Sequence, residues 1–312
     1  MTTTILHTAD DWFVQTDTGA VRIDTTATTT GELLRDRPAI ETASRGSGGV
    51  AVESLALVSP VTAPCRVVAQ MTNFVSHVED SGMDPATIPL TFFRKASGSI
   101  NGPSDDIVKP AHVRFLDYEV EIGLVFGREL PVGTTLTEAN LGDYIAGLVV
   151  TNDVSARDVQ LPKTQFYEAK SYPTFTPVGP FLVLLEAHEL MRFGELRLQL
   201  SVNGEVRQNT VVAGDMIYRP LRALQELTRF QRMDVGDLLL TGTPAGTALS
   251  APPKPIEIIG HLLPPALKWK AFFKSQSKNA KYLHDGDVVE AGIATDDKAI
   301  DLGTQRAVVR YA

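Results

Sequence analysis

From Val67 onward, strand-like runs follow one another with few helical stretches between them. Each run is short and rich in apolar or β-branched residues; they are Tyr118–Phe126, Gly147–Asn152, Phe181–Leu185, Leu196–Val202, Asp237–Leu240 and Asp287–Ala291. The clearest helical pattern is Pro220–Phe230, in which Leu221, Leu224 and Leu227 share one face. Because a doubly wound fold needs a helix after nearly every strand, this order predicts an α+β fold with an antiparallel or mixed sheet.

The first 65 residues differ from the rest of the chain. They contain the short β-prone pieces Trp12–Gln15, Ala20–Ile23 and Val50–Leu57, and a loop of Gly and Ser at Arg45–Gly49. Prolines at positions 60 and 64 close this region. We therefore expect a small, mostly β N-terminal domain at residues 1–65 and a larger domain at residues 66–312.

Residues 251–281 form an unusual segment within the larger domain. They begin with a cluster of prolines and continue into the basic stretch KWKAFFKSQSKNAK. One interpretation is a surface insertion with a solvated lysine face. The other is a flap or a dimer-contact segment, anchored by Trp269, Phe272 and Phe273.

The composition excludes several classes of protein. Hydrophobic residues make up 43% of the 312 residues and charged residues 21%, as in folded rather than disordered proteins. The formal net charge of −8 argues against nucleic acid and against an anionic membrane surface as partners. The single cysteine, Cys65, excludes an intrachain disulfide and a zinc site built from several cysteines. No apolar run approaches the ~18 residues of a membrane span, and the N-terminus lacks the pattern of a secretory signal, so we expect a cytoplasmic protein.

Acidic residues alternate along the segment Leu116–Val125. In a strand, Asp117, Glu119 and Glu121 point to one face, and the apolar residues between them point to the other. Carboxylates on a buried face stay ionised only if a cation compensates their charge. Oxygen ligands favour Mg²⁺ or Mn²⁺, with Ca²⁺ as a further candidate, over zinc. The alternative is an edge strand whose acidic face is solvated.

A further carboxylate, Asp153, follows the apolar run Gly147–Asn152. At the end of a buried strand, it is placed to complete a site made of oxygen ligands. The alternative role is to cap the turn or helix that follows.

Several motifs in order resemble the fumarylacetoacetate hydrolase superfamily over about Val67 to Val309. They are Asn73–His77, Phe92–Ser97, Asp117–Glu121, Asn152–Gln160, Ala169–Ser171, Pro177–Pro180 and Gly236–Gly246. Each motif alone is weak, and the ordered set is strong. Within the superfamily, the chain resembles bacterial acylpyruvate hydrolases and 2-oxo-hepta-3-ene-dioate isomerase-hydratases, which act in aromatic compound catabolism.

The resemblance implies a mixed β-roll catalytic domain, a homodimer, and substrates of the 1,3-dicarbonyl or acylpyruvate class. It implies a divalent metal held by Glu119, Glu121 and Asp153. The residues that it assigns to the substrate are Lys170, near the substrate's oxygens, Gln160, in the pocket, and Thr243, against the bound acid. His77 matches the histidine on a mobile lid that activates water. Arg157 is expected to contribute positive charge, or to pair with Asp153 or Asp158 and support the ligands.

One position departs from the family's pattern. The lid of the family reads His-x-x-Glu, whereas here Asp80 stands three residues after His77. Glu79 is closer in sequence, but two residues along a helix it points to another side. Asp80 is therefore the expected partner of His77, with Glu79 as the alternative.

Three functions remain open from the sequence. The first is a metal-dependent hydrolase that cleaves a carbon–carbon bond in an acylpyruvate or a related β-diketo acid, through an enolate that the metal stabilises. The second is a decarboxylase, tautomerase, isomerase or hydratase of a 2-oxo acid on the same scaffold. The third, a non-catalytic binder of oxo acids, is disfavoured because metal ligands, lysine and candidate base occur together.

Overall fold

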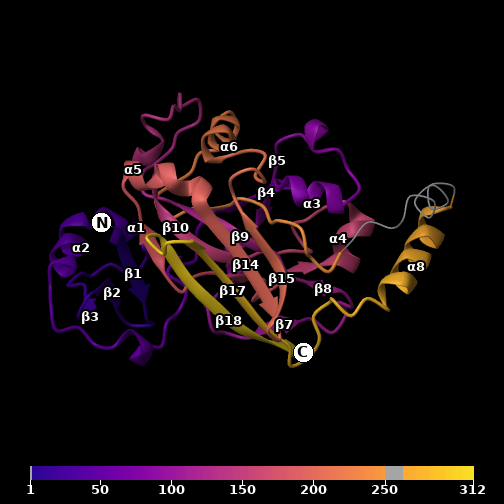
Figure 1. Cartoon of the computed structure of the whole chain (residues 1–312), viewed down its shortest axis with the longest axis horizontal. Helices are drawn as coiled ribbons and strands as arrows, with labels where there is room; N and C mark the ends of the chain where they lie inside the picture. The colour runs from indigo at the N-terminus through magenta and orange to yellow at the C-terminus, as the bar shows by residue number, and fades with distance from the viewer. Residues whose placement is uncertain (1, 250–262) are drawn as a thin grey trace.

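The computed structural model describes residues 2–249 and 263–312 (Figure 1). Its strands are β1 (Thr3–His7), β2 (Trp12–Thr16), β3 (Gly19–Arg22), β4 (Val67–Met71), β5 (Thr91–Lys95), β6 (Ile100–Asn101), β7 (Ile107–Lys109), β8 (Leu116–Asp117), β9 (Val120–Phe126), β10 (Ile145–Asn152), β11 (Ser155–Ala156), β12 (Thr176–Pro177), β13 (Leu182–Leu184), β14 (Leu196–Val202), β15 (Glu205–Val211), β16 (Leu238–Leu240), β17 (Val288–Thr295) and β18 (Asp301–Tyr311). Its α-helices are α1 (Thr30–Arg35), α2 (Arg37–Ser44), α3 (Val75–Asp80), α4 (Arg157–Lys163), α5 (Ala187–Leu190), α6 (Pro220–Leu227) and α8 (Pro265–Gln276). Short 3-10 helices are η1 (Val52–Ser54), η2 (Pro85–Thr87), η3 (Ser97–Ser99), η4 (Leu141–Asp143) and η5 (Met191–Glu195).

Two mixed sheets organise the described residues. The larger has nine strands in the order β3-β2-β1-β13-β10-β9-β16-β4-β5, and the smaller has five in the order β15-β14-β17-β18-β7. Two further pairs, β11 with β8 and β12 with β6, lie beside them. Mixed sheets with short helices between strands confirm the predicted α+β class.

The central strands β9 and β10 are buried along their whole length. Strands covered on both faces have near-continuous apolar sequences, and this pattern predicts both segments as strands. At Gly147, a Cβ atom would lie 2.2 Å from the Val183 carbonyl oxygen, so only glycine permits this approach of β10 to β13.

The five-stranded sheet packs on one face of β9 and β10. Val120, Ile122 and Leu124 point into the core between the two sheets, where they meet Leu198 and Ile293. Helices α1 and α2 cover part of the opposite face of the larger sheet, through a second core. Because side chains alternate along a strand, Glu121 points away from the core between the sheets.

The N-terminal region extends the larger sheet. β1 pairs antiparallel with β13, and β2 and β3 follow it, so the three strands form one end of that sheet (Figure 1). The strand expected at Val50–Leu57 is wrong: this segment contains η1 and only isolated bridges. Its apolar residues Leu55 and Leu57 pack against Leu6 and Phe13, so their burial does not require a paired strand.

The insertion expected at 251–281 is described only from residue 263; residues 250–262 lie outside the described range. The following α8 lies at the edge of the molecule (Figure 1). Phe273 is buried and stacks on Phe115 at a centroid distance of 5.5 Å, and Trp269 and Phe272 pack around it. The aromatic residues thus anchor α8 to its own chain, while Lys270 and Lys274 are exposed.

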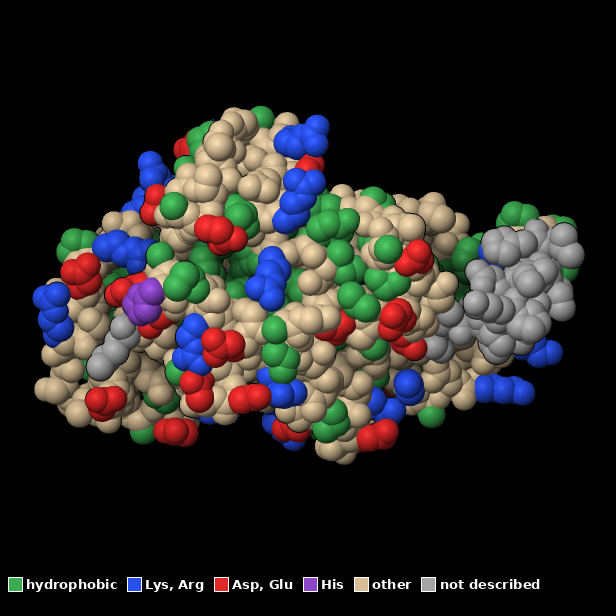
Figure 2. Space-filling view, turned by 45° about the horizontal axis from the view of Figure 1, so that its top comes forward, with side chains coloured by type: hydrophobic (Ala, Val, Ile, Leu, Met, Phe, Trp, Pro, Cys, Tyr) green, Lys and Arg blue, Asp and Glu red, His purple; other side chains and the backbone are tan. Residues whose placement is uncertain are grey.

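The surface carries charges of both signs. On the face shown in Figure 2, basic and acidic side chains are interspersed among apolar ones. Among the described helices, none has the length and hydropathy required to cross a bilayer.

Candidate active site

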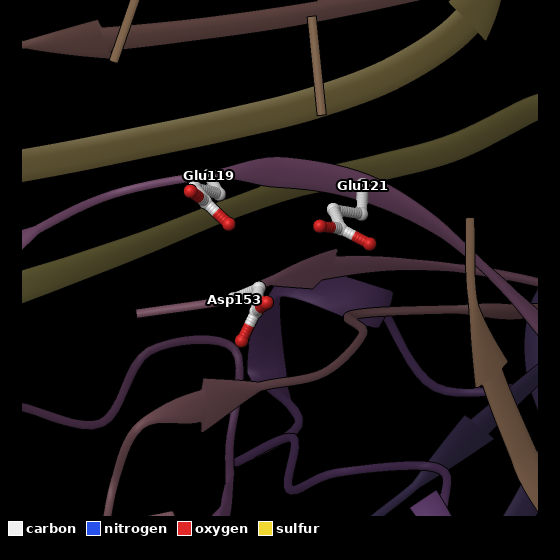
Figure 3. A group of neighbouring side chains, drawn as sticks. All are labelled: Glu119, Glu121 and Asp153. Carbon is white, nitrogen blue, oxygen red and sulfur yellow. The ribbon is translucent and has the colours of Figure 1, made fainter. Parts of the chain in front are cut away.

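Three buried carboxylates converge where β9 begins and β10 ends. Glu119 and Glu121 lie at the start of β9, and Asp153 directly follows β10. One oxygen from each lies within 4.8 Å of the other two. The Asp153 N–H donates to the Glu119 carbonyl at 2.8 Å, which brings Asp153 level with Glu119 across the strand pair. Figure 3 shows Glu119 and Glu121 next to each other along the chain, with Asp153 on the neighbouring segment across from them.

This cluster fits a hard divalent cation. All its donors are carboxylate oxygens, the ligands that Mg²⁺, Mn²⁺ and Ca²⁺ prefer. Burial and the neighbouring carboxylates Asp153 and Glu119 raise the pKa of Glu121 well above its usual value. A bound cation would relieve the repulsion that produces this shift.

Two lysines contact the cluster from different sides of Asp153. Lys170 Nζ donates to Glu119 Oε2 at 2.6 Å and to Asp153 Oδ2 at 2.5 Å. Lys95 Nζ donates to Asp153 Oδ1 and, at 2.9 Å, to the Phe175 carbonyl. Burial lowers the pKa of Lys95, with Asp153 partly opposing it. Burial also acts to lower the pKa of Lys170, but Asp153 and Glu119 outweigh it and hold that pKa above its usual value.

Arg157, the first residue of α4, is fixed in three directions. Its Nε donates to Asp117 Oδ2 at 2.8 Å, its Nη2 to Glu119 Oε1 at 2.5 Å, and its Nη1 to Gln160 Oε1 at 2.9 Å. The expected pairing with Asp153 or Asp158 is therefore not observed. Asp158 instead accepts from the backbone N–H groups of Arg114 at 3.1 Å and Phe115 at 3.3 Å, and lies 3.5 Å from the Arg114 side chain.

Asp117 does not join the candidate ligands, contrary to the alternation expected from a single strand. The strand is interrupted after Asp117, because β8 pairs with β11 and β9 pairs with β10. Asp117 Oδ1 accepts from the backbone N–H groups of Tyr118 and Ala248, each at 2.8 Å, and Oδ2 accepts from Leu249 at 3.0 Å. The carboxylate therefore supports Arg157 and the chain around residue 248.

The segment after β16 donates a backbone hydrogen bond to the carboxylate cluster. Gly242 N–H donates to Glu121 Oε2 at 2.7 Å. Gly242 has a φ of +87°, and a Cβ there would lie 2.7 Å from Asn73 Cβ, so this donor position requires glycine. Next to it, the Thr243 hydroxyl donates to the Val120 carbonyl at 2.9 Å and accepts from Gln208 Nε2 at 2.8 Å.

The lid helix α3 places His77 beside the carboxylates. Ser76 anchors its start, because its N–H and hydroxyl donate to the two oxygens of Asp215 at 2.8 and 2.7 Å. His77 Nδ1 is buried and has no hydrogen-bond partner within residues 2–249 and 263–312. Burial lowers the pKa of His77, with the nearby Glu119 partly opposing it. Glu79 and Asp80 are both exposed.

One cavity of about 410 Å³ joins these groups. The predicted site residues that line it are His77, Glu119, Glu121, Asp153, Arg157, Gln160, Lys170 and Thr243. Another cavity of similar size lies over β14, β17 and β18 and is lined by none of these residues. The structure thus brings together the predicted ligands, lysine, histidine and pocket residues, and leaves only Glu79 and Asp80 outside the cavity lining.

Sequence reasoning missed Lys95. The motif Phe92–Ser97 was recognised, but no role was given to the lysine within it. The pattern that could have indicated Lys95 is its position at the end of a β-prone run. A lysine buried there requires an anionic partner.

The chain is similar to known proteins over most of its length. Residues 66–310 match the family model described as fumarylacetoacetate (FAA) hydrolase C-terminal. The chain is 32% identical over 269 residues to the 2,4-didehydro-3-deoxy-L-rhamnonate hydrolase of Sphingomonas sp. (strain SKA58), covering 84% of this chain and 81% of that protein. It is 32% identical over 197 residues to the mitochondrial oxaloacetate tautomerase Fahd2a of Rattus norvegicus. That match covers 63% of this chain and 61% of the relative, which is less than two thirds of its length.

Solved structures share the fold over the whole chain. A probable 2-hydroxyhepta-2,4-diene-1,7-dioate isomerase from Mycobacterium abscessus superposes with a TM-score of 0.74 at 27% identity, covering 100% of this chain and 99% of that one. A maleylpyruvate hydrolase from Sphingobium sp. SYK-6 has a TM-score of 0.70 at 20% identity, covering 99% of this chain and 100% of that one, and is similar in fold.

Proposed function

The chain belongs to the fumarylacetoacetate hydrolase family, and we propose that it is a metal-dependent hydrolase that cleaves a carbon–carbon bond in an acylpyruvate or another β-diketo acid. One observation carries the proposal. Three buried carboxylates, with oxygens within 4.8 Å of one another, share a cavity with an imidazole whose Nδ1 has no partner among the described residues. This arrangement combines a place for a hard cation with a group that can take a proton.

Glu119, Glu121 and Asp153 would hold the metal ion. When bound, Mg²⁺ or Mn²⁺ supplies positive charge that stabilises the oxygens of a 2-oxo acid and the enolate charge that develops there. Gly242 N–H keeps the Glu121 carboxylate in place, and Arg157 does the same for Glu119.

His77 is the proposed general base. It takes a proton from a water molecule, which attacks the acyl carbonyl carbon distal to the oxo acid. The bond between that carbon and the methylene then breaks, and its electron pair remains on the pyruvate fragment as an enolate. The proton from His77 returns to the methylene carbon, so that the acylpyruvate and water give a carboxylic acid and pyruvate. Because burial lowers the pKa of His77, the imidazole is uncharged at neutral pH and ready to accept the proton.

Lys170 and Arg157 are proposed to bind the anionic end of the substrate. Both are held as cations by buried carboxylates, and both line the cavity. When all groups are counted as ionised, the four carboxylates exceed the three cations by one negative charge; the groups are Asp117, Glu119, Glu121 and Asp153 and Lys95, Arg157 and Lys170. A divalent cation would turn this balance positive by one, which suits an anionic oxo acid.

The relatives include both a hydrolase and a tautomerase. The more fully covered of the two relatives described above is a hydrolase of a didehydro-deoxy sugar acid, and the other is an oxaloacetate tautomerase. We propose that the present chain acts on an acid with carbonyl groups at carbons 2 and 4, the arrangement found in an acylpyruvate.

Tautomerisation or decarboxylation of a 2-oxo acid such as oxaloacetate is the second candidate. The observation that favours it is the exposure of Glu79 and Asp80, because neither carboxylate orients His77 in this conformation. Hydrolysis requires an activated water, whereas these reactions need only charge stabilisation and a proton transfer.

The deciding experiment supplies purified protein and Mg²⁺ with acetylpyruvate or oxaloacetate, and identifies the products by mass. The proposal predicts acetate and pyruvate from acetylpyruvate. Pyruvate and CO₂ from oxaloacetate, with acetylpyruvate untouched, would assign decarboxylation instead. Interconversion of keto and enol oxaloacetate alone, followed by ultraviolet absorbance, would assign tautomerisation.

A further inference from the structure

The cavity has a second wall that the mechanism does not use. It is formed by the side chains of Met71 at the end of β4, Phe93 on β5, Leu161 on α4, Phe166 in the loop after α4, and Leu249. None of these five side chains carries an N–H or O–H group. These five side chains, called the apolar wall below, line the cavity together with the charged groups and the polar residues Gln70, Thr72, Ser81 and Thr164.

The apolar wall begins directly beside the ionic cluster. Phe93 lies with its ring centroid 5.2 Å from Lys170 Nζ, the ammonium that contacts Glu119 and Asp153. Phe166 meets Phe93 edge to face, at a centroid distance of 5.1 Å and an angle of 83°. The pair thus continues the cavity away from Lys170 as a surface of aromatic rings.

Both rings are only half-buried, although they stand next to fully buried residues. Apolar surface left uncovered at a cavity gains free energy when an apolar ligand covers it. A polar ligand group placed there would lose its hydrogen bonds to water without replacing them on the five side chains. With a volume of about 410 Å³, the cavity is in the size range of sites that enclose whole small-molecule ligands.

We propose that Phe93, Phe166, Leu161 and Met71 form an acyl pocket, and that the substrate is a 3-acylpyruvate whose acyl group is aromatic or a bulky hydrocarbon. This inference rests on the proposed function. The oxo-acid end lies against Lys170 and the carboxylates, and the acyl carbon chain extends over the ring pair.

The first test measures binding without turnover. Isothermal titration calorimetry with the Mg²⁺-loaded protein compares 2-oxo-4-phenylbutanoate with 2-oxopentanoate, which have no 4-oxo group and are not substrates for the cleavage. The phenyl compound is expected to bind at least about tenfold more tightly, because an apolar pocket rewards each added hydrocarbon group. Equal affinities, or no binding of the phenyl compound, would overturn the acyl pocket.

Variants locate the effect. Phe166→Ala is expected to remove most of the tenfold preference, and Leu161→Gln, which keeps the side-chain volume, is expected to reduce it as well. Phe230→Ala is the matched control, because Phe230 is 64% exposed and does not line the cavity; its preference should equal that of the wild type. A preference that survives both Phe166→Ala and Leu161→Gln, in protein that melts cooperatively, would contradict the proposal.

Turnover separates the pocket from the reaction. The same protein is assayed with benzoylpyruvate and acetylpyruvate, and kcat/KM should favour benzoylpyruvate at least about tenfold. If the phenyl compound binds preferentially but neither acylpyruvate is cleaved, the pocket stands and the proposed hydrolysis fails. If acetylpyruvate is cleaved and the two 2-oxo acids bind equally, hydrolysis stands and the acyl pocket fails.

Discussion

Lys95 and Asp153 form an ion pair in which neither side chain is more than 1% exposed. Lys95 stands at the end of β5 and reaches Asp153 from the side opposite to Lys170, so the carboxylate is held through both of its oxygens. Asp153 is one of the three candidate metal ligands. Its orientation is therefore fixed by the protein before any cation binds, and the two lysines on Asp153 distinguish this site from a simple acidic cluster.

Replacing Lys95 with methionine should destabilise the metal-free protein by about 3 kcal/mol, because the buried Asp153 carboxylate loses one of its two cationic partners and keeps only Lys170. Mg²⁺ should recover more stability in this variant than in the wild type, since the cation compensates Asp153. Urea denaturation with and without Mg²⁺ measures both effects. Lys298→Met is the control: Lys298 is 69% exposed and pairs with Asp301, so its loss should cost less than about 1 kcal/mol. Wild-type stability of Lys95→Met in the absence of Mg²⁺ would show that the pair has no such role.

The Glu121→Gln variant should bind Mg²⁺ or Mn²⁺ at least about 100-fold more weakly, because a neutral amide replaces one of three anionic ligands. Calorimetric titration of chelator-stripped protein measures this affinity. The matched control is Glu290→Gln, on β17 and away from the three-carboxylate cluster, which should bind as the wild type does. Unchanged affinity in Glu121→Gln would remove this residue from the ligand set.

The three clustered carboxylates could be placed from the sequence because they sit at the ends of strongly apolar strands, whereas the resemblance to the family supplied His77, Gln160, Lys170 and Thr243. Asp153 follows a run that is buried along its whole length, and Glu119 and Glu121 begin another, so their positions follow from the strand assignment. The interruption between β8 and β9 could not be predicted, because it depends on which partner strand each half pairs with. For that reason Asp117 was expected beside the ligands, whereas it binds Arg157.

The fold shows the same limit. The α+β class follows from the spacing of strands and helices, but the segment Val50–Leu57 packs on Leu6 of β1 and Phe13 of β2 without forming a strand. Local β propensity does not reveal whether a partner edge is available. Lys95 was missed for a related reason: its burial depends on Asp153, 58 residues away in the sequence.

The rate of hydrolysis should fall at low pH through the protonation of His77. Because burial lowers the pKa of His77, the fall in kcat/KM lies below the histidine reference value of ~6.5, and the rate is independent of this group at higher pH. The pH profile is measured at saturating Mg²⁺. His77→Ala should lower kcat by roughly 10²–10⁴-fold and abolish the fall in kcat/KM at low pH. Its Mg²⁺ affinity should stay close to that of the wild type. Equal losses of Mg²⁺ affinity and rate would show that His77 acts at the metal instead.

Asp80→Asn should lower kcat for hydrolysis more than Glu79→Gln does. Asp80 lies three residues after His77 and shares its side of the helix, whereas Glu79 points elsewhere. A change of side-chain rotamer when the lid closes over substrate would let the Asp80 carboxylate pair with the His77 ring. Steady-state kinetics on acetylpyruvate compares the two variants, and both side chains are exposed, so neither substitution should change the melting temperature appreciably. A larger fall in Glu79→Gln would make Glu79 the partner of His77.

The most direct test of metal-dependent cleavage follows acetylpyruvate turnover while Mg²⁺ is titrated into chelator-stripped protein. The account predicts no acetate or pyruvate before the addition, and a rate that rises to a plateau as Glu119, Glu121 and Asp153 take up one ion per chain. Full cleavage by the stripped protein would contradict metal dependence. Cleavage would be contradicted if acetylpyruvate stays intact with Mg²⁺ and with Mn²⁺ while the same protein turns over another 2-oxo acid.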